Sequence, residues 1–301
     1  MSDILPLSSI WLLWLSFTLT SAVIAVGGYF LLIYADGIAD RIQLGRTWVG
    51  AVLLATVTSL PELIAAIGAV TVANGPDMAA GNVLGSCAFN LCLVFFFFAL
   101  YRERSVYSRA SHSHVLSGSL SIILVGVLIL SLALRAQKLG FSMAHVGIDT
   151  LVIFVFYGFA MRTLHRFGLQ EAKTPSEEEP AKSELSLESL ITRYMVASLA
   201  VVVAGWSLPL IGREIVNLMG WNEAFVGTVL IAFTTSLPEM AVTLAAIRVG
   251  AVDLAFANVL GSNLFNVAII GISDLFYLKG PLLEAVQPIH QVTGLITIMM
   301  T

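Results

Sequence analysis

The chain has few charges: only 11% of its 301 residues are Asp, Glu, Lys or Arg, whereas 58% are hydrophobic. Soluble domains carry about 25% charged residues, so a water-soluble enzyme, a nucleic-acid-binding protein and a disordered chain are excluded. The sequence has no basic patch that would suit nucleic acid. The composition instead predicts a polytopic protein embedded in the lipid bilayer.

Cysteine is also scarce. The two cysteines, Cys87 and Cys92, stand five residues apart in one apolar run. That spacing places them on different faces of a helix, which argues against a disulfide or a metal pair and favours small packing residues.

The net charge of −4 comes from one segment, residues 167–188, which holds six Glu and two Lys. Its low hydrophobicity and its two prolines predict an acidic, flexible linker. The segment lacks the ligand spacing of an EF-hand, so it is not expected to sense Ca²⁺.

Long apolar runs dominate the rest of the chain, and their length predicts transmembrane helices, each of which needs about 20 residues. The first run is far longer than the core of a signal peptide, about 7–15 residues, so it is expected to be retained. The fold class is therefore an all-α polytopic membrane protein. The nine predicted spans are 8–34, 47–72, 77–100, 115–134, 142–161, 192–211, 222–247, 253–278 and 285–301.

The basic residues between these spans predict the orientation. Loops one, three, five and seven, with the span ends beside them, carry 11 Lys and Arg, and the even-numbered loops carry 4. The positive-inside rule then places the odd loops and the linker in the cytoplasm and the amino terminus outside. Because the chain is compact and its linker short, the bacterial inner membrane is the expected location.

Two motifs occur twice. T-S-L-P-E stands at 58–62 and at 235–239, and D-x-A-x-x-N-V-L-G-S-x-x-F-N stands at 77–90 and at 253–266. The copies are five predicted helices apart, an odd number, so they enter the membrane from opposite sides. This pattern predicts a five-plus-five inverted-topology repeat, typical of secondary transporters. The first repeat would span 1–166 and the second 189–301.

Glu62 and Glu239 are the only acidic residues near the middle of apolar runs. A charge at that depth costs at least about 2.5–3.5 kcal/mol on insertion scales and usually serves a function. No Lys or Arg stands near the middle of a run, so bound cations or protons must neutralise the two carboxylates. Pro61 and Pro238 precede these glutamates, and because proline has no N–H, each should break its helix and free backbone carbonyls.

Hydroxyl and amide side chains surround these positions in both copies. Ser86 and Asn90 are four residues apart on one helix face, as are Ser262 and Asn266. Every side-chain ligand at the positions that the copies share is an oxygen donor, and none is Cys or His. This set favours a hard cation such as Ca²⁺ over zinc, copper or nickel. The further hydroxyls are those of Thr58, Ser59, Thr235 and Ser236.

The paired motifs resemble the α-repeats of the calcium:cation antiporter superfamily, closest to the sodium/calcium exchangers, over 55–95 and 232–267. The resemblance implies alternating access, in which the first and sixth helices slide across the core. It implies a Ca²⁺ site of Glu62, Glu239 and the backbone carbonyls of Thr58 and Thr235. The Na⁺ sites that it implies use Ser59, Ser86, Ser236, Ser262 and the carbonyls of Ala55 and Ala232, with Asn90 and Asn266 lining the centre.

Two departures from the family pattern stand out. Many members carry Asp where this chain has Asn266, so the site has two formal negative charges rather than three, which matches one Ca²⁺ or two Na⁺. The family plan also has ten helices, whereas this sequence stops within or just after the ninth, so the tenth is expected to be missing.

The leading hypothesis is therefore a transporter, not an enzyme, that exchanges Ca²⁺ for Na⁺ and uses no cofactor besides the transported ions. A Ca²⁺/H⁺ antiporter that protonates the same two glutamates is the alternative, although four serines suit Na⁺ better than a proton. An intramembrane hydrolase would need a metal-binding or nucleophilic motif that is absent. A cation channel gains little from a site built to occlude an ion.

Overall fold

A computed structural model describes residues 10–41, 56–101, 112–171, 185–248 and 252–301 of the chain. These residues form helices, apart from one short hairpin and the connecting turns. The α-helices are α1 (Ile10–Arg41), α3 (Leu60–Thr71), α4 (Pro76–Tyr101), α6 (His112–Ala136), α7 (Ile148–Glu171), α8 (Leu187–Met219), α9 (Glu223–Phe225), α10 (Ala232–Thr235), α11 (Leu237–Arg248), α12 (Val252–Phe276), α13 (Leu282–Ala285) and α14 (Ile289–Met300). A π-helical turn, η1 (Val226–Ile231), and two strands, β1 (Ser142–Met143) and β2 (Val146–Gly147), complete the order.

Six of the described helices are long and apolar enough to cross a membrane, and the bent pair 223–235 and 237–248 makes a seventh. Two shorter apolar helices, α3 and α14, have 12 residues each, about 18 Å at 1.5 Å per residue. Every one of the nine predicted spans overlaps at least one of these helices. A polytopic helical membrane protein is thus confirmed, whereas the count of nine stays a prediction because residues 42–55, before α3, lie outside the described ranges.

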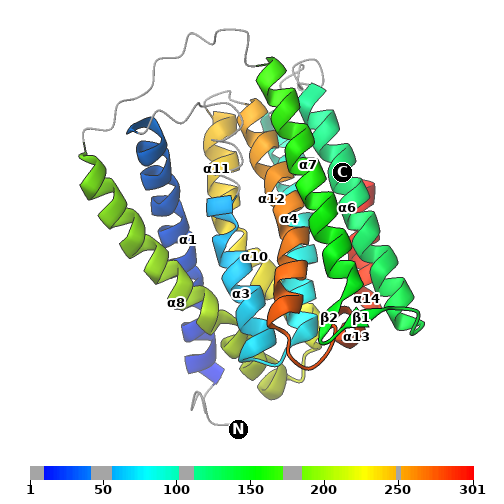
Figure 1. Cartoon of the computed structure of the whole chain (residues 1–301). Coiled ribbons are helices and arrows are strands. Elements are labelled where there is room, and N and C mark those ends of the chain that lie inside the picture. Colours follow the sequence, from blue (N-terminus) through cyan, green and yellow to red (C-terminus); the bar gives the residue numbers. More distant parts are fainter. Residues whose placement is uncertain (1–9, 42–55, 102–111, 172–184, 249–251) are drawn as a thin grey trace.

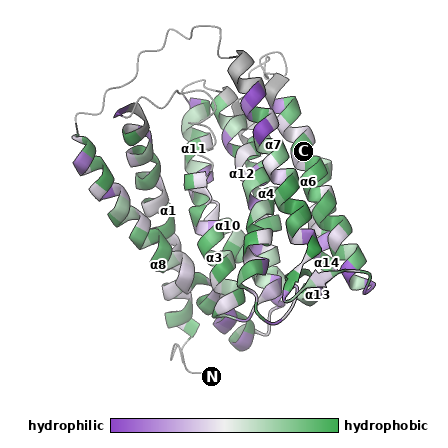
Figure 2. Cartoon of the chain, in the orientation of Figure 1, coloured by the Kyte–Doolittle hydropathy of each residue, from purple (hydrophilic) through white to green (hydrophobic). Residues whose placement is uncertain are grey.

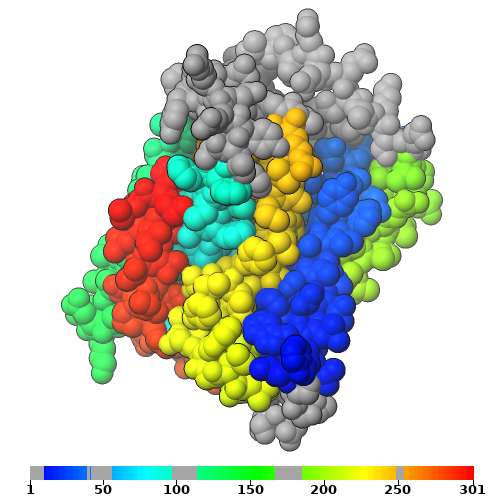
Figure 3. Space-filling model, turned by 180° about the vertical axis from the view of Figure 1, so that it is seen from behind, coloured from blue at the N-terminus to red at the C-terminus, as the bar shows by residue number. Residues whose placement is uncertain are grey.

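The helices form a central group flanked on two sides (Figure 1). α3, α4, α10–α11 and α12 pack against one another at the centre. α1 and α8 pack together on one side, and α6, α7 and α14 lie on the other. Figure 3 shows α14, α4, the η1–α11 segment and α1 side by side on the opposite face. Burial follows this order: 72% of the span in α12 is buried but only 11% of that in α1.

The outer helices expose apolar side chains, as lipid requires. Large hydrophobic residues are exposed along α1, α6, α7 and α8, for example Leu19, Leu130 and Phe159. In Figure 2, much of the length of these helices has the colour of hydrophobic residues. Such extensive apolar exposure would cause aggregation in water but is the normal state of a surface in a bilayer.

The fifth span begins later than predicted. The sequence indicates a helix from residue 142, but α7 starts at Ile148, because β1 and β2 form an antiparallel hairpin just before it. α7 then continues to Glu171, past the predicted end at 161. The predicted linker 167–188 therefore begins in α7 and ends in α8, and its middle, 172–184, lies outside the described residues.

Glycine allows α4 to approach the π-helical turn closely. A Cβ on Gly85 would lie 2.8 Å from Ala232 Cβ and 2.9 Å from Thr228 Cα, closer than real Cβ atoms pack. A Cβ on Gly81 would meet the Thr228 backbone nitrogen at 2.8 Å. The Gly81-x-x-x-Gly85 stripe therefore brings the backbones of the two motif regions together.

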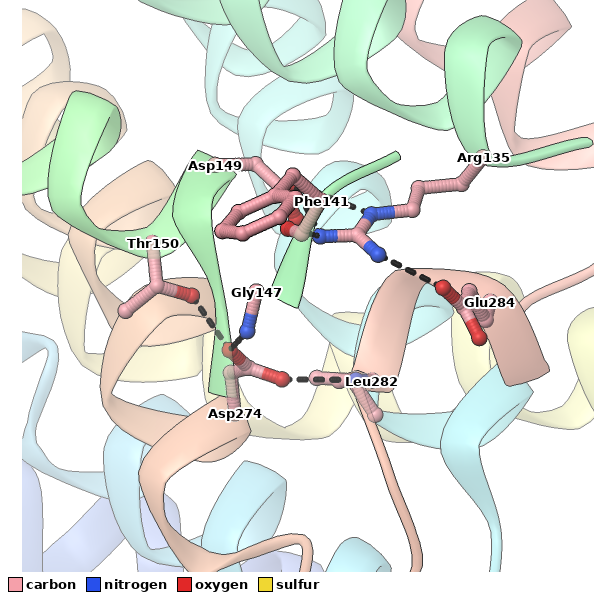
Figure 4. A network of polar contacts seen from close by, with 8 residues as sticks. All are labelled: Arg135, Phe141, Gly147, Asp149, Thr150, Asp274, Leu282 and Glu284. Atoms are coloured by element: carbon pink, nitrogen blue, oxygen red, sulfur yellow. Dashed lines mark hydrogen bonds and ion pairs between the residues drawn. The ribbon is translucent and has the colours of Figure 1, made fainter. Parts of the chain in front are cut away.

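A buried arginine fastens α6 and α7 to the segment after α12 (Figure 4). The Arg135 side chain donates to Asp149 Oδ1 at 2.7 Å and to Glu284 Oε1 at 2.6 Å. Asp274 accepts hydrogen bonds from the Thr150 hydroxyl at 2.5 Å and from the Leu282 backbone N–H at 2.6 Å. The Arg135 cluster, meaning Arg135, Asp149, Asp274 and Glu284, thus ties together three parts of the chain that are far apart in sequence.

Candidate cation site

Both proline motifs break their helices at the same point. Ser59 has φ −86° and ψ 11°, and Ser236 has φ −84° and ψ 5°, so each serine departs from helical geometry. Pro61 and Pro238 occupy the first turns of α3 and α11, where proline is tolerated. In the second copy, the break bends the helix by 47°. The helix breaks predicted from the two prolines are confirmed.

The breaks place Glu62 and Glu239 in the first turns of α3 and α11. Neither side chain is exposed to solvent. The amino-terminal end of a helix carries partial positive charge, which offsets part of the cost of burying a carboxylate. Because like charges repel and burial disfavours charge, a cation beside the two acids would offset the cost of ionising both.

Each motif supplies a serine to the glutamate of the other motif. Ser59 donates to Glu239 Oε1 at 2.9 Å, and Ser236 donates to Glu62 Oε1 at 3.0 Å. The second oxygen, Oε2, of each glutamate is buried without a hydrogen-bond partner. The hydrogen bonds and ion pairs of the described residues include no basic partner for either acid. One oxygen of each acid is thus oriented by a serine, and the other is available to an ion.

Four further hydroxyls complete the ring around the acids. Thr58 Oγ1 lies 3.5 Å from Ser262 Oγ, and Thr235 Oγ1 lies 3.4 Å from Ser86 Oγ. Ser262 also donates to Glu239 Oε1 at 3.4 Å. Ser86 donates to the Ala232 carbonyl at 3.5 Å, so that carbonyl faces the site. Its predicted counterpart, Ala55, lies outside the described residues.

Two asparagines that were not among the predicted site residues form hydrogen bonds to the backbone carbonyls of the glutamates. Asn82 donates to the Glu62 carbonyl at 3.0 Å and accepts from the Thr235 hydroxyl at 2.9 Å. Asn258 donates to the Glu239 carbonyl at 3.4 Å. Both occupy the shared Asn of D-x-A-x-x-N, so the repeat contained a signal that would have found them.

Asn90 and Asn266 lie at the crossing of α4 and α12, fully buried. Asn90 donates to Asn263 Oδ1 at 3.2 Å, while Asn266 has no hydrogen-bond partner on either amide atom. Cys87 and Asn263, on the same two helices, are also fully buried. They occupy the same position of the motif but are different residue types, so comparison of the repeats gave no signal for them.

Eleven of the twelve predicted site residues lie in the described ranges, and all eleven are buried. Hydrogen bonds join nine of them to one another, whereas Asn90 and Asn266 lie at the crossing of α4 and α12. The atoms that could coordinate an ion are carboxylate, hydroxyl, carbonyl and amide oxygens, which suit hard cations. Such a set at broken helices inside an apolar bundle defines a membrane transporter of cations.

Comparison with known proteins agrees with that class. Residues 12–162 and 188–301 match the model of the sodium/calcium exchanger protein family. The chain belongs to this family, and with it to the calcium:cation antiporter superfamily that the motifs indicated. It is thus a cation/Ca²⁺ antiporter and an integral membrane protein.

Among curated relatives, the inner membrane protein YrbG of Escherichia coli K12 is 28% identical over 271 residues, which cover 84% of this chain and 78% of the relative. The crystal structure of the H⁺/Ca²⁺ exchanger CAX superposes with a TM-score of 0.68 at 13% identity, covering 95% of this chain and 73% of that one. The sodium–calcium exchanger NCX_Mj superposes with a TM-score of 0.55 at 20% identity, covering 97% and 90%. These two likenesses establish a common fold.

Proposed function

We propose that this antiporter exchanges Ca²⁺ for Na⁺ by alternating access at the site formed by Glu62 and Glu239. The observation that carries the proposal is the pair of buried carboxylates, each with one oxygen oriented by a serine and one without a partner. Thr58 and Thr235 add backbone carbonyls for Ca²⁺, and Na⁺ uses the four serines with the carbonyls of Ala55 and Ala232. The family model is itself described as a sodium/calcium exchanger.

Charge arithmetic supports competition between the two ions. Two ionised glutamates carry −2, which one Ca²⁺ or two Na⁺ neutralise. Asn266 adds an oxygen without adding charge. Since the same two negative charges must balance either kind of ion, one Ca²⁺ and two Na⁺ are not expected to occupy the site together.

The same charges account for obligatory exchange. An empty site would leave two carboxylates uncompensated in a low-dielectric interior, where unpaired charges cost several kcal/mol each. The protein is therefore expected to close around the site only when cations fill it. An antiporter needs this property, because a site that crosses the membrane empty would permit transport in one direction alone.

The proposed inverted repeat is supported by three pairs of matched contacts. The crossed serine–glutamate bonds form the first pair. The bonds from Asn82 and Asn258 to the glutamate carbonyls form the second. The threonine–serine contacts between Thr235 and Ser86 and between Thr58 and Ser262 form the third. A repeat of five plus five helices related by a two-fold axis in the membrane plane would produce such pairs.

The moving part in this proposal is the pair α1 and α8, the first and sixth predicted helices. A Cβ on Gly28 of α1 would lie 2.7 Å from Pro238 Cβ, and a Cβ on Gly205 of α8 would lie 3.5 Å from the Pro61 carbonyl oxygen. Each helix thus presents a glycine to one of the two breaks. Because glycine has no side chain to interlock with its neighbours, such contacts suit a helix pair that slides past the ion site.

For the membrane orientation we propose an amino terminus outside, a cytoplasmic linker and the bacterial inner membrane. The carboxyl ends of α1 and α7 lie at the same end of the bundle (Figure 1), as required for loops one and five to share a side. A protease site inserted in the linker tests this placement, since cleavage should occur only from the cytoplasmic side.

Reconstitution tests the function. Proteoliposomes loaded with Na⁺ and diluted into Na⁺-free medium should accumulate Ca²⁺. Glu62→Gln and Glu239→Gln should each reduce this uptake to background, because a single carboxylate cannot balance Ca²⁺. Glu188→Gln, an exposed control, should transport like the wild type. Wild-type rates from either site variant would falsify the assignment.

A pH gradient applied without Na⁺ separates the two counter-ions. The Na⁺ mechanism predicts no Ca²⁺ accumulation under these conditions. Accumulation driven by the pH gradient, with no response to Na⁺, would replace the proposal with Ca²⁺/H⁺ exchange at the same two glutamates.

A further inference from the structure

Arg213, near the end of α8, is bonded to two other parts of the chain. Its guanidinium donates to the Ala73 carbonyl at 2.8 Å, to the Asn74 carbonyl at 2.7 Å and to Glu223 Oε2 at 2.8 Å. Ala73 and Asn74 belong to the turn between α3 and α4, and Glu223 begins α9. These four groups, here called the Arg213 latch, fasten α8 to the turn after α3. In the proposed mechanism α8 is one of the two helices that slide.

The turn is shaped for this contact. Asn74 has φ 50°, a left-handed conformation that asparagine tolerates better than most residues. The end of a helix carries partial negative charge, so a guanidinium is a favourable partner for the carbonyls of Ala73 and Asn74 just after α3. A Cβ on Gly75 would lie 2.9 Å from Glu223 Oε1 and 3.2 Å from Arg213 Nη2. Glycine at this position therefore leaves room for the ion pair.

The second half of α8 runs along α3 from the glutamate to the latch. A Cβ on Gly205 would lie 3.5 Å from the Pro61 carbonyl oxygen, next to Glu62, and Arg213 reaches the turn after α3. The apolar residues between these points are between 0% and 3% exposed and belong to the main hydrophobic core: Leu208, Ile211 and, just beyond, Ile215. An ion would have to lose its hydration to cross such packing. The site is therefore closed towards this end of the bundle.

The first half of α8 is held much less tightly. Within residues 187–200, all of which the structure describes, Leu190 is the only buried residue. Most of the packing that attaches α8 to the central helices thus lies in its second half. Sliding of α8 has to break those contacts, and the Arg213 latch is their charged component.

The other sliding helix has no equivalent of Arg213. The shift in sequence that relates the two glutamates also relates Gly28 of α1 to Gly205 of α8. The same shift relates Asp36 of α1 to Arg213. An ionised carboxylate only accepts hydrogen bonds, so Asp36 cannot donate to backbone carbonyls as Arg213 does. The latch therefore favours one of the two alternating conformations, the one that is closed at this end.

We propose that Arg213 is a positioning residue for the exchange cycle, whose latch holds the site closed at the end of the bundle where α8 ends and must release each time that end opens. This inference rests on the proposed alternating access but not on the identity of the counter-ion. α8 ends where α1 begins (Figure 1), so in the proposed orientation this end faces the outside. The latch thus sets how often the site faces outward.

Sided measurements of Ca²⁺ affinity test the latch, with Ca²⁺ uptake followed in right-side-out and in inverted vesicles. In Arg213→Ala the external Ca²⁺ concentration for half-maximal uptake should fall about tenfold, corresponding to roughly 1.4 kcal/mol. The reason is that apparent affinity rises with the fraction of molecules open to that side. The value for the cytoplasmic side should change by no more than about twofold, because that conformation is already the major one.

Two further variants separate the latch from general effects of the substitution. Arg213→Lys keeps the charge and should give an intermediate value. Arg193→Ala is the matched control, because Arg193 lies in the same helix but is exposed, and it should behave like the wild type on both sides. Equal changes on both sides of the membrane in Arg213→Ala would show a merely structural role and overturn the inference.

Cross-linking tests whether the latch must release. In the double variant Asn74→Cys and Arg213→Cys, a bifunctional methanethiosulfonate reagent should reduce Ca²⁺ uptake to background, and a reducing agent should restore it. Each single-cysteine variant treated with the same reagent controls for simple modification and for the native cysteines. Uptake at the untreated rate by the cross-linked protein would overturn the inference, because α8 could then work without leaving the turn.

Distances between spin labels test the latch without transport. Thr71 and Leu218 are exposed residues near the ends of α3 and α8 and accept labels as Thr71→Cys and Leu218→Cys in a Cys92→Ser background. One distance should dominate with Arg213 present, and Arg213→Ala should add a longer one. If the proposed function fails, the vesicles accumulate no Ca²⁺ with Na⁺ or with a pH gradient, while this change in distance remains. Identical distance distributions with and without Arg213 would overturn the inference alone.

Discussion

At each buried glutamate, the two carboxylate oxygens have different surroundings. Oε1 accepts a serine hydroxyl from the opposite motif, while Oε2 has no partner. The hydrogen bond fixes the rotation of the carboxylate, so Oε2 is held in position before an ion arrives. Such preorganisation reduces the ordering cost of binding.

The serine hydroxyls give a prediction at this scale. Ser86→Ala removes an uncharged oxygen from the proposed Na⁺ site, so the Na⁺ concentration for half-maximal uptake should rise about tenfold, corresponding to roughly 1.4 kcal/mol. The measurement is Ca²⁺ uptake at varied internal Na⁺. Ser121→Ala is the control: Ser121 is equally buried but lies in α6, and its hydroxyl has no partner. An equal shift in both variants would show that Ser86 acts through general packing.

At the scale of helices, the contact between α1 and the second helix break is possible because Gly28 has no side chain. The ideal Cβ of Gly28 would overlap the Pro238 ring. Any side chain there must push α1 away from α11 or hold it in one position.

We therefore expect Gly28→Ala to slow transport while leaving the fold intact. Overpacking costs about 1–3 kcal/mol, and about 1.4 kcal/mol in the barrier for sliding lowers the maximal rate tenfold. Initial uptake rates at saturating Ca²⁺ measure this effect. Gly126→Ala is the control, because a Cβ at Gly126 meets no atom within 4 Å. Unchanged transport by Gly28→Ala would exclude a close contact between α1 and Pro238 during the cycle.

Much of this arrangement follows from sequence, for identifiable reasons. Proline lacks the N–H that a helix needs, so the two breaks were predictable from Pro61 and Pro238, each beside a buried glutamate. Proline alone is not sufficient, because Pro209 lies inside α8, which continues without a break. The hairpin before α7 was not predictable, because residues 141–147 are apolar enough to read as part of a span. Asn263 was missed because its partners, Asn90 and the Cys87 carbonyl, lie on another helix.

For the whole molecule, we expect stability and the proposed transport to depend on different regions. The Arg135 cluster joins α6, α7 and α13 at one end of the bundle, away from α1 and α8 (Figures 1 and 4). Only 1% of the Arg135 side chain is exposed. Asp149, whose side chain is 8% exposed, therefore depends on Arg135 to balance its charge, whereas Glu284 is 48% exposed.

Loss of this arginine should destabilise the protein strongly. Arg135→Ala leaves the buried Asp149 without its cation, and breaking such a buried pair costs about 3–5 kcal/mol. The thermal unfolding temperature in detergent should fall clearly. Arg213→Ala is the comparison, because Arg213 pairs with Glu223 at 2.8 Å but is 26% exposed. Its loss should lower that temperature much less, and equal effects would contradict the importance of burial.

The crossed serine–glutamate bonds have a consequence for how the gene can evolve. Ser59 hydrogen-bonds to Glu239 of the second motif, and Ser236 hydrogen-bonds to Glu62 of the first. Neither half of the polypeptide therefore contains a complete site. A gene cut within the linker would yield two inactive pieces, and activity should return only when both are made in the same cell. Selection must therefore act on the two halves jointly, however far their remaining residues diverge.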